Sequence, residues 1–534
     1  MKELKFEELT LEQKLGMVMT GAIVREDGLW NDEMFKENLE FILELIRKRS
    51  LGAVWISPRI KKWKEAMKAV KAVADYPILI ITDAEPGIGE HLIGRHNAIG
   101  STASEELAYT FGKVTGVTAR EMGYNVVCDP VLDMCDRWET CGSNSRSLGS
   151  DKYKVTKLAM AESKGLHDGG VLNVAKHYPG GKDKLDIDSH MAPNYCDMTK
   201  EELLEYDLYP YVELIKEGLI DGIMTSHKTY IKIDAENPGS LSKKVNDFIR
   251  EQGFETGFTI TDALDMMSIR AKYGDVYSKG LAIAGGNELC LPWIETSEKA
   301  YNSLIKCYEE GIFTQERLDE AVKRVLWAQH KVLSLSQDAI ITDKDIEDFA
   351  KINRSIYAKT DDGIPVALDK NGRYFFAVVV KNETEINDQG KVSVDTFTNE
   401  WYNPELIIKK LESLFPNSAI RAISQFPTPH QNESILIDSL EYDDVIFINF
   451  AEAPAYAGSD HITHRMVALM NAFTLTNRAS TIVHFGNPYV LEDAPHMKRI
   501  LIGGISTDST MAGLEVLAGN YNAEGVLTYN VNFK

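Results

Sequence analysis

Short apolar runs alternate with longer amphipathic stretches over the first two-thirds of this 534-residue chain. The runs have the length and composition of buried strands and occupy residues 17–20, 53–57, 78–82, 126–131, 172–175, 222–225, 259–261 and 289–291. The stretches between them have helical spacing, at 34–48, 62–74, 103–122, 151–167, 200–217, 243–252, 275–284, 297–310 and 315–335. Eight strand candidates, each followed by a helix, predict a (β/α)8 barrel. An open doubly wound sheet is the alternative, but it needs fewer units, and no GxGxxG follows the first run.

A second, shorter alternation begins near residue 374. Its strand candidates are 375–380, 444–450, 480–485 and 499–503, and its helix candidates are 403–415 and 462–477. Between the two alternations lies a polar stretch with one helical pattern, at 344–360. We therefore predict a catalytic barrel over 1–336, a linker over 337–372, and a smaller open α/β sandwich domain over 373–534.

Charge and composition exclude several classes of partner. The net charge of −22 argues against a nucleic acid or an anionic membrane surface as a partner. No apolar run reaches the ~18–20 residues of a membrane span, and the first 16 residues lack the apolar core of a secretion signal. The six cysteines form no CxxC pair, so we expect reduced thiols, a cytoplasmic location and no metal site.

Polar residues stand where several of the apolar runs end. In a barrel the carboxyl ends of all strands open on one face, so these side chains are expected to share a pocket. They are Asp83, Lys176, His177, His227 and Asp262, and the fourth run leads on to Arg146.

The stretch from Leu172 to His190 carries the densest set of such residues. After Lys176 and His177 it breaks at Pro179-Gly180-Gly181 and closes on Asp188-Ser189-His190. Asp188 and His190 project to the same side of an extended segment, where the carboxylate favours the imidazolium form of the ring. That pairing makes His190 a candidate proton donor and acceptor. The alternative is a solvated loop, with His177 as a packed core histidine.

These motifs together resemble glycoside hydrolase family 3, and within it the β-N-acetylglucosaminidases. The family's KHFPGHGDT…DSH pattern is similar to residues 176–184 followed by 188–190, and its [ST]D-x-L-x-M motif to residues 261–266. Further similar segments are 83–87, 129–133 with 146–148, 224–227, 239–242 and, in the second domain, 485–489. The resemblance covers residues 8–335 well and the remainder more weakly. The family's PGHGDT loop differs here, with Gly181, Lys182 and Lys184 replacing its histidine, glycine and threonine.

The resemblance implies roles for individual residues. Asp262 is then the nucleophile of a retaining mechanism, and His190, oriented by Asp188, is the acid/base. Asp83, Arg146, Lys176, His177 and His227 stand at positions implied to bind the sugar. This chemistry requires no cofactor or metal.

The leading hypothesis is a retaining exo-β-N-acetylglucosaminidase that hydrolyses terminal N-acetyl-β-D-glucosaminides, such as those of cell-wall fragments. A β-N-acetylglucosaminide or β-glucoside phosphorylase, and a family 3 β-glucosidase or β-xylosidase, remain alternatives. A carbohydrate-binding or sensory protein on a decayed barrel is a fourth, disfavoured by the intact Asp262 and Asp188–His190 pair. The partner in each case is a carbohydrate; the aglycone, the role of the second domain and a homodimer are left open.

Overall fold

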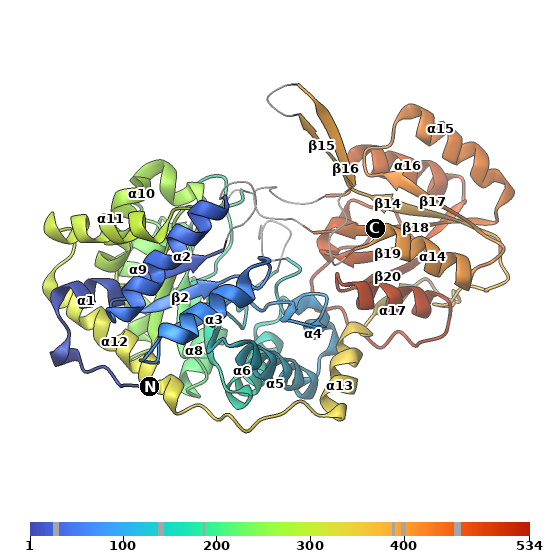
Figure 1. Ribbon diagram of the computed structural model, residues 1–534. Coiled ribbons are helices and arrows are strands. Elements are labelled where there is room, and N and C mark those ends of the chain that lie inside the picture. Colours follow the sequence, from blue (N-terminus) through green and yellow to red (C-terminus); the bar gives the residue numbers. More distant parts are fainter. Residues whose placement is uncertain (25–30, 137–143, 185–186, 387–389, 397–401, 453–460) are drawn as a thin grey trace. The chain divides into compact units, whose positions relative to one another are not determined.

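The computed structural model describes residues 1–24, 31–136, 144–184, 187–386, 390–396, 402–452 and 461–534 (Figure 1). The chain divides into two compact units. The first contains Met1–His91, Ala108–Met134 and Lys152–Ile346; the second contains Leu92–Leu107, Cys135–Asp151 and Glu347–Lys534. The domain bounds predicted from the sequence stay a prediction, and each unit is described by itself.

The first unit is built on an eight-stranded parallel sheet that confirms the predicted barrel. In sheet order the strands are β1 (Thr20–Ile23), β2 (Ala53–Ile56), β3 (Leu79–Thr82), β6 (Val126–Val127), β7 (Leu172–Tyr178), β9 (Gly222–Thr225), β11 (Phe258–Ala263) and β12 (Leu289–Leu291). The last strand returns to the first, because Met19 forms a parallel bridge with Cys290, whose N–H donates to Val18 O at 3.1 Å. The carboxyl ends of these strands therefore meet at one mouth.

Most helices lie close to the predicted places. The helices at 11–17 and 96–102 were not predicted, the latter belongs to the second unit, and the stretch 200–217 forms two helices. The helices are α1 (Leu11–Met17), α2 (Asp32–Arg47), α3 (Trp63–Val73), α4 (His96–Thr102), α5 (Glu105–Met122), α6 (Lys152–Gly169), α7 (Lys200–Glu205), α8 (Tyr209–Lys216), α9 (Lys243–Glu251), α10 (Met267–Ala284), α11 (Ser297–Glu309) and α12 (Gln315–Leu333). The strand predicted at 17–20 was placed too early, because it begins at Thr20 and not at Met17. A capping box between Thr10 and Gln13 begins α1, which runs through Met17 and leaves the strand to start at Thr20.

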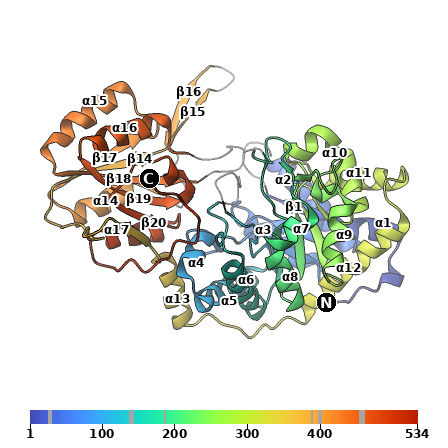
Figure 2. The same ribbon diagram turned by 180° about the vertical axis from the view of Figure 1, so that it is seen from behind.

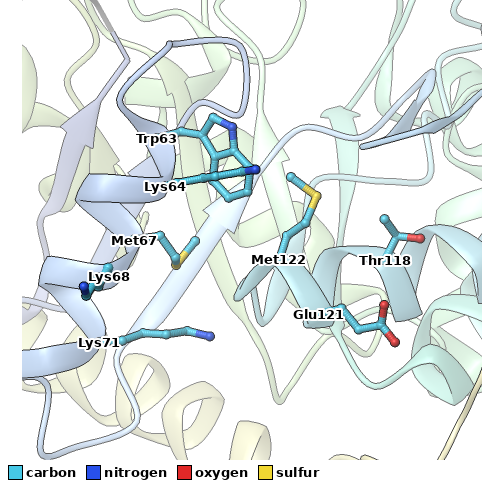
Figure 3. A pocket seen from close by; sticks show the side chains of 8 residues that line it. All are labelled: Trp63, Lys64, Met67, Lys68, Lys71, Thr118, Glu121 and Met122. Atoms are coloured by element: carbon cyan, nitrogen blue, oxygen red, sulfur yellow. The ribbon is translucent and has the colours of Figure 1, made fainter.

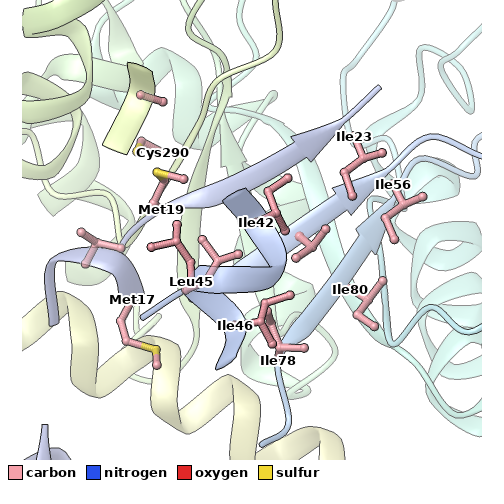
Figure 4. Packing of buried hydrophobic residues seen from close by; sticks show 14 of the residues in the cluster. Met17, Met19, Ile23, Ile42, Leu45, Ile46, Ile56, Ile78, Ile80 and Cys290 are labelled. Atoms are coloured by element: carbon pink, nitrogen blue, oxygen red, sulfur yellow. The ribbon is translucent and has the colours of Figure 1, made fainter. Parts of the chain in front are cut away.

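The barrel strands are apolar on both faces, which explains why they read as continuous apolar runs. Ala53, Trp55, Leu79 and Ile81 belong to the cluster inside the barrel. The alternate positions pack outward, where Ile23, Ile56 and Ile80 belong to one cluster with Ile42, Leu45 and Ile46 of α2 (Figure 4). Full burial stabilises each such side chain by about 1.5–3 kcal/mol relative to exposure.

The second unit is a six-stranded sheet with helices on both faces (Figures 1 and 2). The sheet order is β13 (Tyr357–Thr360), β20 (Arg499–Gly503), β19 (Ala479–Gly486), β18 (Asp444–Ala451), β14 (Tyr374–Val380) and β17 (Ala419–Ser424). Helices α15 (Pro429–Asp438) and α16 (His464–Leu475) contribute to the core on one face, and α14 (Pro404–Leu414) and α17 (Thr507–Leu517) to the core on the other. This confirms the predicted α/β sandwich.

The remaining elements are short or were predicted differently. The helix expected at 344–360 is wrong beyond Asn353: α13 (Asp343–Asn353) stops there, and residues 357–360 pair antiparallel with β20 as strand β13. Pairing with a strand 140 residues away overrides the local pattern. Two-stranded pairs are β4 (Gly87–Ile88) with β5 (His91–Leu92), β8 (Tyr195–Cys196) with β10 (Thr229–Tyr230), and β15 (Asn382–Ile386) with β16 (Val392–Thr396). In the part of the chain that the structure describes, no helix is long and apolar enough to cross a membrane.

We expect His484, buried in β19, to make the second unit sensitive to acid. Its ring bonds Asn449 Nδ2 at 3.0 Å and Asn487 O at 2.7 Å, and burial lowers its pKa to about 4. Below pH ~6.5 the unfolded chain binds a proton that the folded ring does not, so the free energy of unfolding falls by about 1.4 kcal/mol per pH unit down to pH ~4. Hydrogen exchange of the β18 and β19 amides at pH 7 and pH 5 measures this. A His484→Gln variant that lost as much protection between the two pH values as wild type would contradict it.

Candidate active site

Four barrel strands deliver charged side chains to the mouth of the barrel. Strand β3 leads into Asp83, β7 carries Lys176 and His177, β9 leads to His227, and β11 carries Asp262. All four strands are parallel, so these residues stand at the same end of the first unit. The structure thus brings together the predicted strand-end residues of this unit.

Lys176 is a buried cation between two carboxylates. Its Nζ lies 2.6 Å from Asp83 Oδ1 and 2.6 Å from Glu85 Oε1. The Lys176 side chain is 2% exposed, whereas that of Asp83 is 46% exposed. A buried ammonium is stable only when it is paired, and loss of a partner costs about 3–5 kcal/mol. Asp83 therefore presents its carboxylate to the mouth while Lys176 fixes it. Glu85, for which the sequence predicted no role, is the second carboxylate on Lys176.

His177 is oriented by Asp133. Its Nδ1 lies 2.6 Å from Asp133 Oδ2, and its backbone N–H donates to Asp133 Oδ1 at 3.2 Å. Both side chains are partly exposed, at 16% and 11%. His177 is therefore a histidine at the mouth of the barrel whose ring Asp133 orients, and not a packed core residue.

The peptide that follows Asp262 is fixed from two sides. The Ala263 N–H donates to Asp262 Oδ1 at 2.7 Å, and Ala263 O lies 2.8 Å from His227 Nε2. His227 Nδ1 lies 2.7 Å from Ser240 Oγ. Burial lowers the pKa of His227. Nε2 carries the proton that the ring donates to Ala263 O, and Nδ1 faces the Ser240 hydroxyl. These contacts make His227 a positioning residue for the Asp262 strand end; its predicted role in sugar binding stays a prediction.

The surroundings of Asp262 keep its carboxylate ionised. Burial alone would raise its pKa, but the imidazoles of His227, His177 and His190 and the Ala263 amide outweigh burial and hold the pKa below the usual value. The residue is partly exposed. An ionised, accessible carboxylate at a strand end can act as a nucleophile.

The Asp188–His190 pair forms as predicted. Asp188 Oδ1 lies 2.7 Å from His190 Nδ1 and accepts the His190 backbone N–H at 2.8 Å. The His190 side chain is 34% exposed and that of Asp188 is 10% exposed. The carboxylate therefore fixes the ring while leaving it accessible from solvent.

The turn that carries this pair is docked onto the start of α10. The first amides of a helix have no partner within the helix. Here the Met267 N–H donates to His190 O at 3.1 Å, and the Ser268 N–H donates to Ser189 O at 3.3 Å. Because α10 begins five residues after Asp262, these bonds tie the acid/base candidate to the nucleophile candidate.

The structure shows the surroundings of Gly181, Lys182 and Lys184, the loop residues that differ from the family pattern. Gly181 has φ +87°, and a Cβ there would lie 2.9 Å from Cys196 Sγ, so the family's histidine does not fit this backbone. Lys228 Nζ holds the same loop by bonding Gly181 O at 2.7 Å and Asp183 Oδ1 at 2.6 Å. Lys184 is half exposed and lies 4.0 Å from Asp197, and Lys182 Nζ lies 5.8 Å from the ring centre of Tyr206.

Two further side chains border the mouth without having been predicted. Asp265 is buried and accepts the N–H groups of Trp293 and Ile294, the latter at 2.8 Å. The ring of Trp293 packs edge-on against Trp55, with centroids 5.5 Å apart. Asp265 lies within the segment that resembles the nucleophile motif, but its partner is 28 residues away, so the sequence carried no signal for the contact.

Arg146 belongs to the second unit, and its predicted role stays a prediction.

Carboxylates and imidazoles that meet at the strand ends of a (β/α)8 barrel can carry out the chemistry of glycoside hydrolysis. Residues 10–328 match the glycosyl hydrolase family 3 N-terminal domain, and the chain belongs to this family, as its motifs predicted. It is 29% identical over 302 residues to a β-hexosaminidase of Haemophilus influenzae, covering 53% of this chain and 80% of the relative. It is 27% identical over 233 residues to a β-hexosaminidase of Idiomarina loihiensis, covering 42% and 69%.

Solved structures share the fold of the whole chain. A family 3 β-N-acetylglucosaminidase from Paenibacillus sp. FPU-7 superposes with a TM-score of 0.79 at 23% identity, covering 98% of this chain and 100% of that one. The β-glucoside phosphorylase BglX superposes with a TM-score of 0.80 at 21% identity, covering 98% and 95%. At this identity the likeness shows the two-domain fold alone.

Ser240→Ala tests whether His227 positions the nucleophile. Without the hydroxyl, the ring loses the bond that orients it and Ala263 O loses a fixed donor. We expect kcat on aryl glycosides to fall about tenfold while KM changes less than twofold, since no sugar contact is removed. Steady-state kinetics measures the split. Ser303→Ala, which also removes a hydroxyl bonded to a backbone carbonyl (Lys299 O, 2.8 Å), is the control. A rise in KM with unchanged kcat would rule the positioning role out.

Proposed function

We propose that this enzyme is a retaining, exo-acting β-N-acetylglucosaminidase that removes terminal N-acetyl-β-D-glucosaminides, such as those of cell-wall fragments. The observation that carries the proposal is the Asp188–His190 pair, closed at 2.7 Å and docked on the helix that follows Asp262. The β-hexosaminidase relatives support the substrate class. We further propose a cytoplasmic location, which the free thiols of Cys128, Cys196, Cys290 and Cys307 support.

In the first step, the Asp262 carboxylate attacks the anomeric carbon and the bond to the leaving oxygen breaks. His190, protonated and held by Asp188, gives its Nε2 proton to that oxygen. In the second step, the neutral His190 takes a proton from water, the water oxygen attacks the anomeric carbon, and Asp262 is released as a carboxylate. The proton that His190 gave in the first step is thereby restored, and two inversions give net retention.

The sugar is held through its hydroxyls by charged groups. Asp83, fixed by Lys176, accepts hydrogen bonds from hydroxyls, and His177, oriented by Asp133, forms a second polar contact. Hydrogen bonds to charged groups are about twice as strong as neutral ones, which suits recognition of a solvated sugar.

A phosphorylase is the second candidate, favoured by one feature of the site. After giving its proton, His190 is neutral, whereas a carboxylate in that place would repel an incoming phosphate. Phosphate, not water, would then attack the glycosyl-enzyme intermediate and release a sugar 1-phosphate.

The first test is release of nitrophenol from 4-nitrophenyl N-acetyl-β-D-glucosaminide with and without phosphate. We expect phosphate-independent release by wild type and loss of at least about 10⁴-fold in Asp262→Ala, because the nucleophile is gone. Asp247→Ala, which removes an exposed carboxylate on α9, is the control. Release that rises with phosphate and yields a sugar 1-phosphate would establish the phosphorylase instead. Release from the matching glucoside or xyloside alone would overturn the substrate assignment.

His190→Ala tests the acid/base role through the leaving group. A nitrophenolate leaves with little help, whereas an alkyl or sugar alkoxide needs a proton. We therefore expect a loss of about 10²–10⁴-fold on disaccharide substrates and a much smaller loss in the first step with activated aryl substrates. Azide, which needs no general base, should restore turnover of the aryl substrate and form a β-glycosyl azide. Equal losses on both substrates with no azide product would show that His190 is not the acid/base.

A further inference from the structure

A groove on the outside of the barrel lies apart from the strand ends. It runs between α3 and α5 and has a volume of about 560 Å³ (Figure 3). Its lining residues are Trp63, Lys64, Met67, Lys68, Lys71, Thr118, Glu121 and Met122. These helices flank β3 in the chain, and β3 and β11 are four strands apart in the eight-stranded barrel. The groove is therefore on the opposite side of the barrel from the Asp262 strand.

One wall of the groove is strongly basic. Lys64, Lys68 and Lys71 follow one another at four- and three-residue spacing along α3, so they share a side of the helix. All three are exposed, and none forms an ion pair with a residue that the structure describes. Residues 59–71 contain six lysines and arginines and one glutamate, in a chain whose net charge is −22. This wall is a local positive surface on an acidic protein.

The floor and one end of the groove are apolar. Met67 and Met122 reach toward each other from the two helices, with Trp63 at one end and Lys71 toward the other (Figure 3). Methionine side chains adapt to varied apolar partners.

We propose that this groove docks an acidic amphipathic helix of a partner protein. Lys71 follows Lys64 by seven positions of α3, about 10 Å along the helix axis, which is more than one carboxylate or phosphate can span. Carboxylates at i, i+4 and i+7 of a helix match that spacing, and its adjacent apolar face fits Trp63, Met67 and Met122. Glu121 lines the groove on the α5 side and repels carboxylates, so those of the partner helix face the lysines of α3.

The test uses a fluorescein-labelled helical peptide with glutamates at four-residue spacing beside a leucine and phenylalanine stripe. Fluorescence anisotropy measures its binding to the full chain at low and high salt. We expect binding that weakens with salt and falls at least about tenfold in Lys64→Glu/Lys68→Glu/Lys71→Glu. The control is Lys157→Glu/Lys164→Glu/Lys299→Glu, which makes the same charge change at exposed lysines of α6 and α11 and should lose less than about threefold.

Four outcomes would overturn the proposal. If a peptide with lysines in place of the glutamates bound equally well, the groove would not select acidic helices. If the groove variant and wild type had equal affinity for the acidic peptide, the peptide would not bind at the groove. Equal competition by poly-glutamate, which lacks the apolar stripe, would show a general anion surface. A dimer in sedimentation velocity that dissociates only in the groove variant would make a second copy of this chain the occupant. Turnover of the aryl substrate, expected to be unchanged, confirms that each variant is folded.

Discussion

Parallel pairing of the barrel strands is the constraint on which the site depends. Strand register places the end of β7 beside the ends of β6 and β9, and the end of β11 beside that of β9. The side chains of the site come from segments that are far apart in the sequence, and only the folded barrel brings these segments together. If one strand slipped by a single residue, its inward and outward side chains would exchange faces. The apolar residues on both faces of each strand oppose such a slip, because interior and exterior cores are both filled.

Within that frame, charge pairing decides which carboxylate is available for chemistry. Lys176 is shared by Asp83 and Glu85, His177 is held by Asp133, and His190 is held by Asp188. Asp262 differs, because it accepts a hydrogen bond from the amide of its own neighbour, Ala263. The surrounding imidazoles lower its pKa through space without bonding it. A carboxylate that is ionised but not neutralised by a direct contact keeps its reactivity toward an electrophilic carbon.

The sequence could predict this barrel because strand and helix patterns are local, and the strand-end residues because parallel strands share one polarity. The 17–20 strand shifted because a capping box at Thr10 extended the preceding helix. The end of the 344–360 helix was lost because β13 pairs with a strand far along the chain. Glu85, Ser240 and the Asp265–Trp293 contact were missed for the same reason, since each depends on a partner that only the folded barrel brings near. Resemblance to a family supplied roles for Asp262 and His190 that spacing alone could not separate from helix capping or a solvated loop.

A short helical segment at the start of α10 connects the end of the Asp262 strand to the turn that carries Asp188 and His190. Helix α10 contains a break at Gly274, with φ +68° and ψ 172°, so its first part is a separate segment of two turns. That segment supplies the amides of Met267 and Ser268 to the Asp188–His190 turn and follows directly on the Asp262 strand end. A proton donor on a loop is otherwise free to adopt many positions, and the reaction is slower when few of these positions place the donor beside the leaving oxygen. Anchoring the turn on the helix start that the nucleophile strand itself leads into limits that freedom, and it does so with two backbone hydrogen bonds that put no demand on side-chain identity.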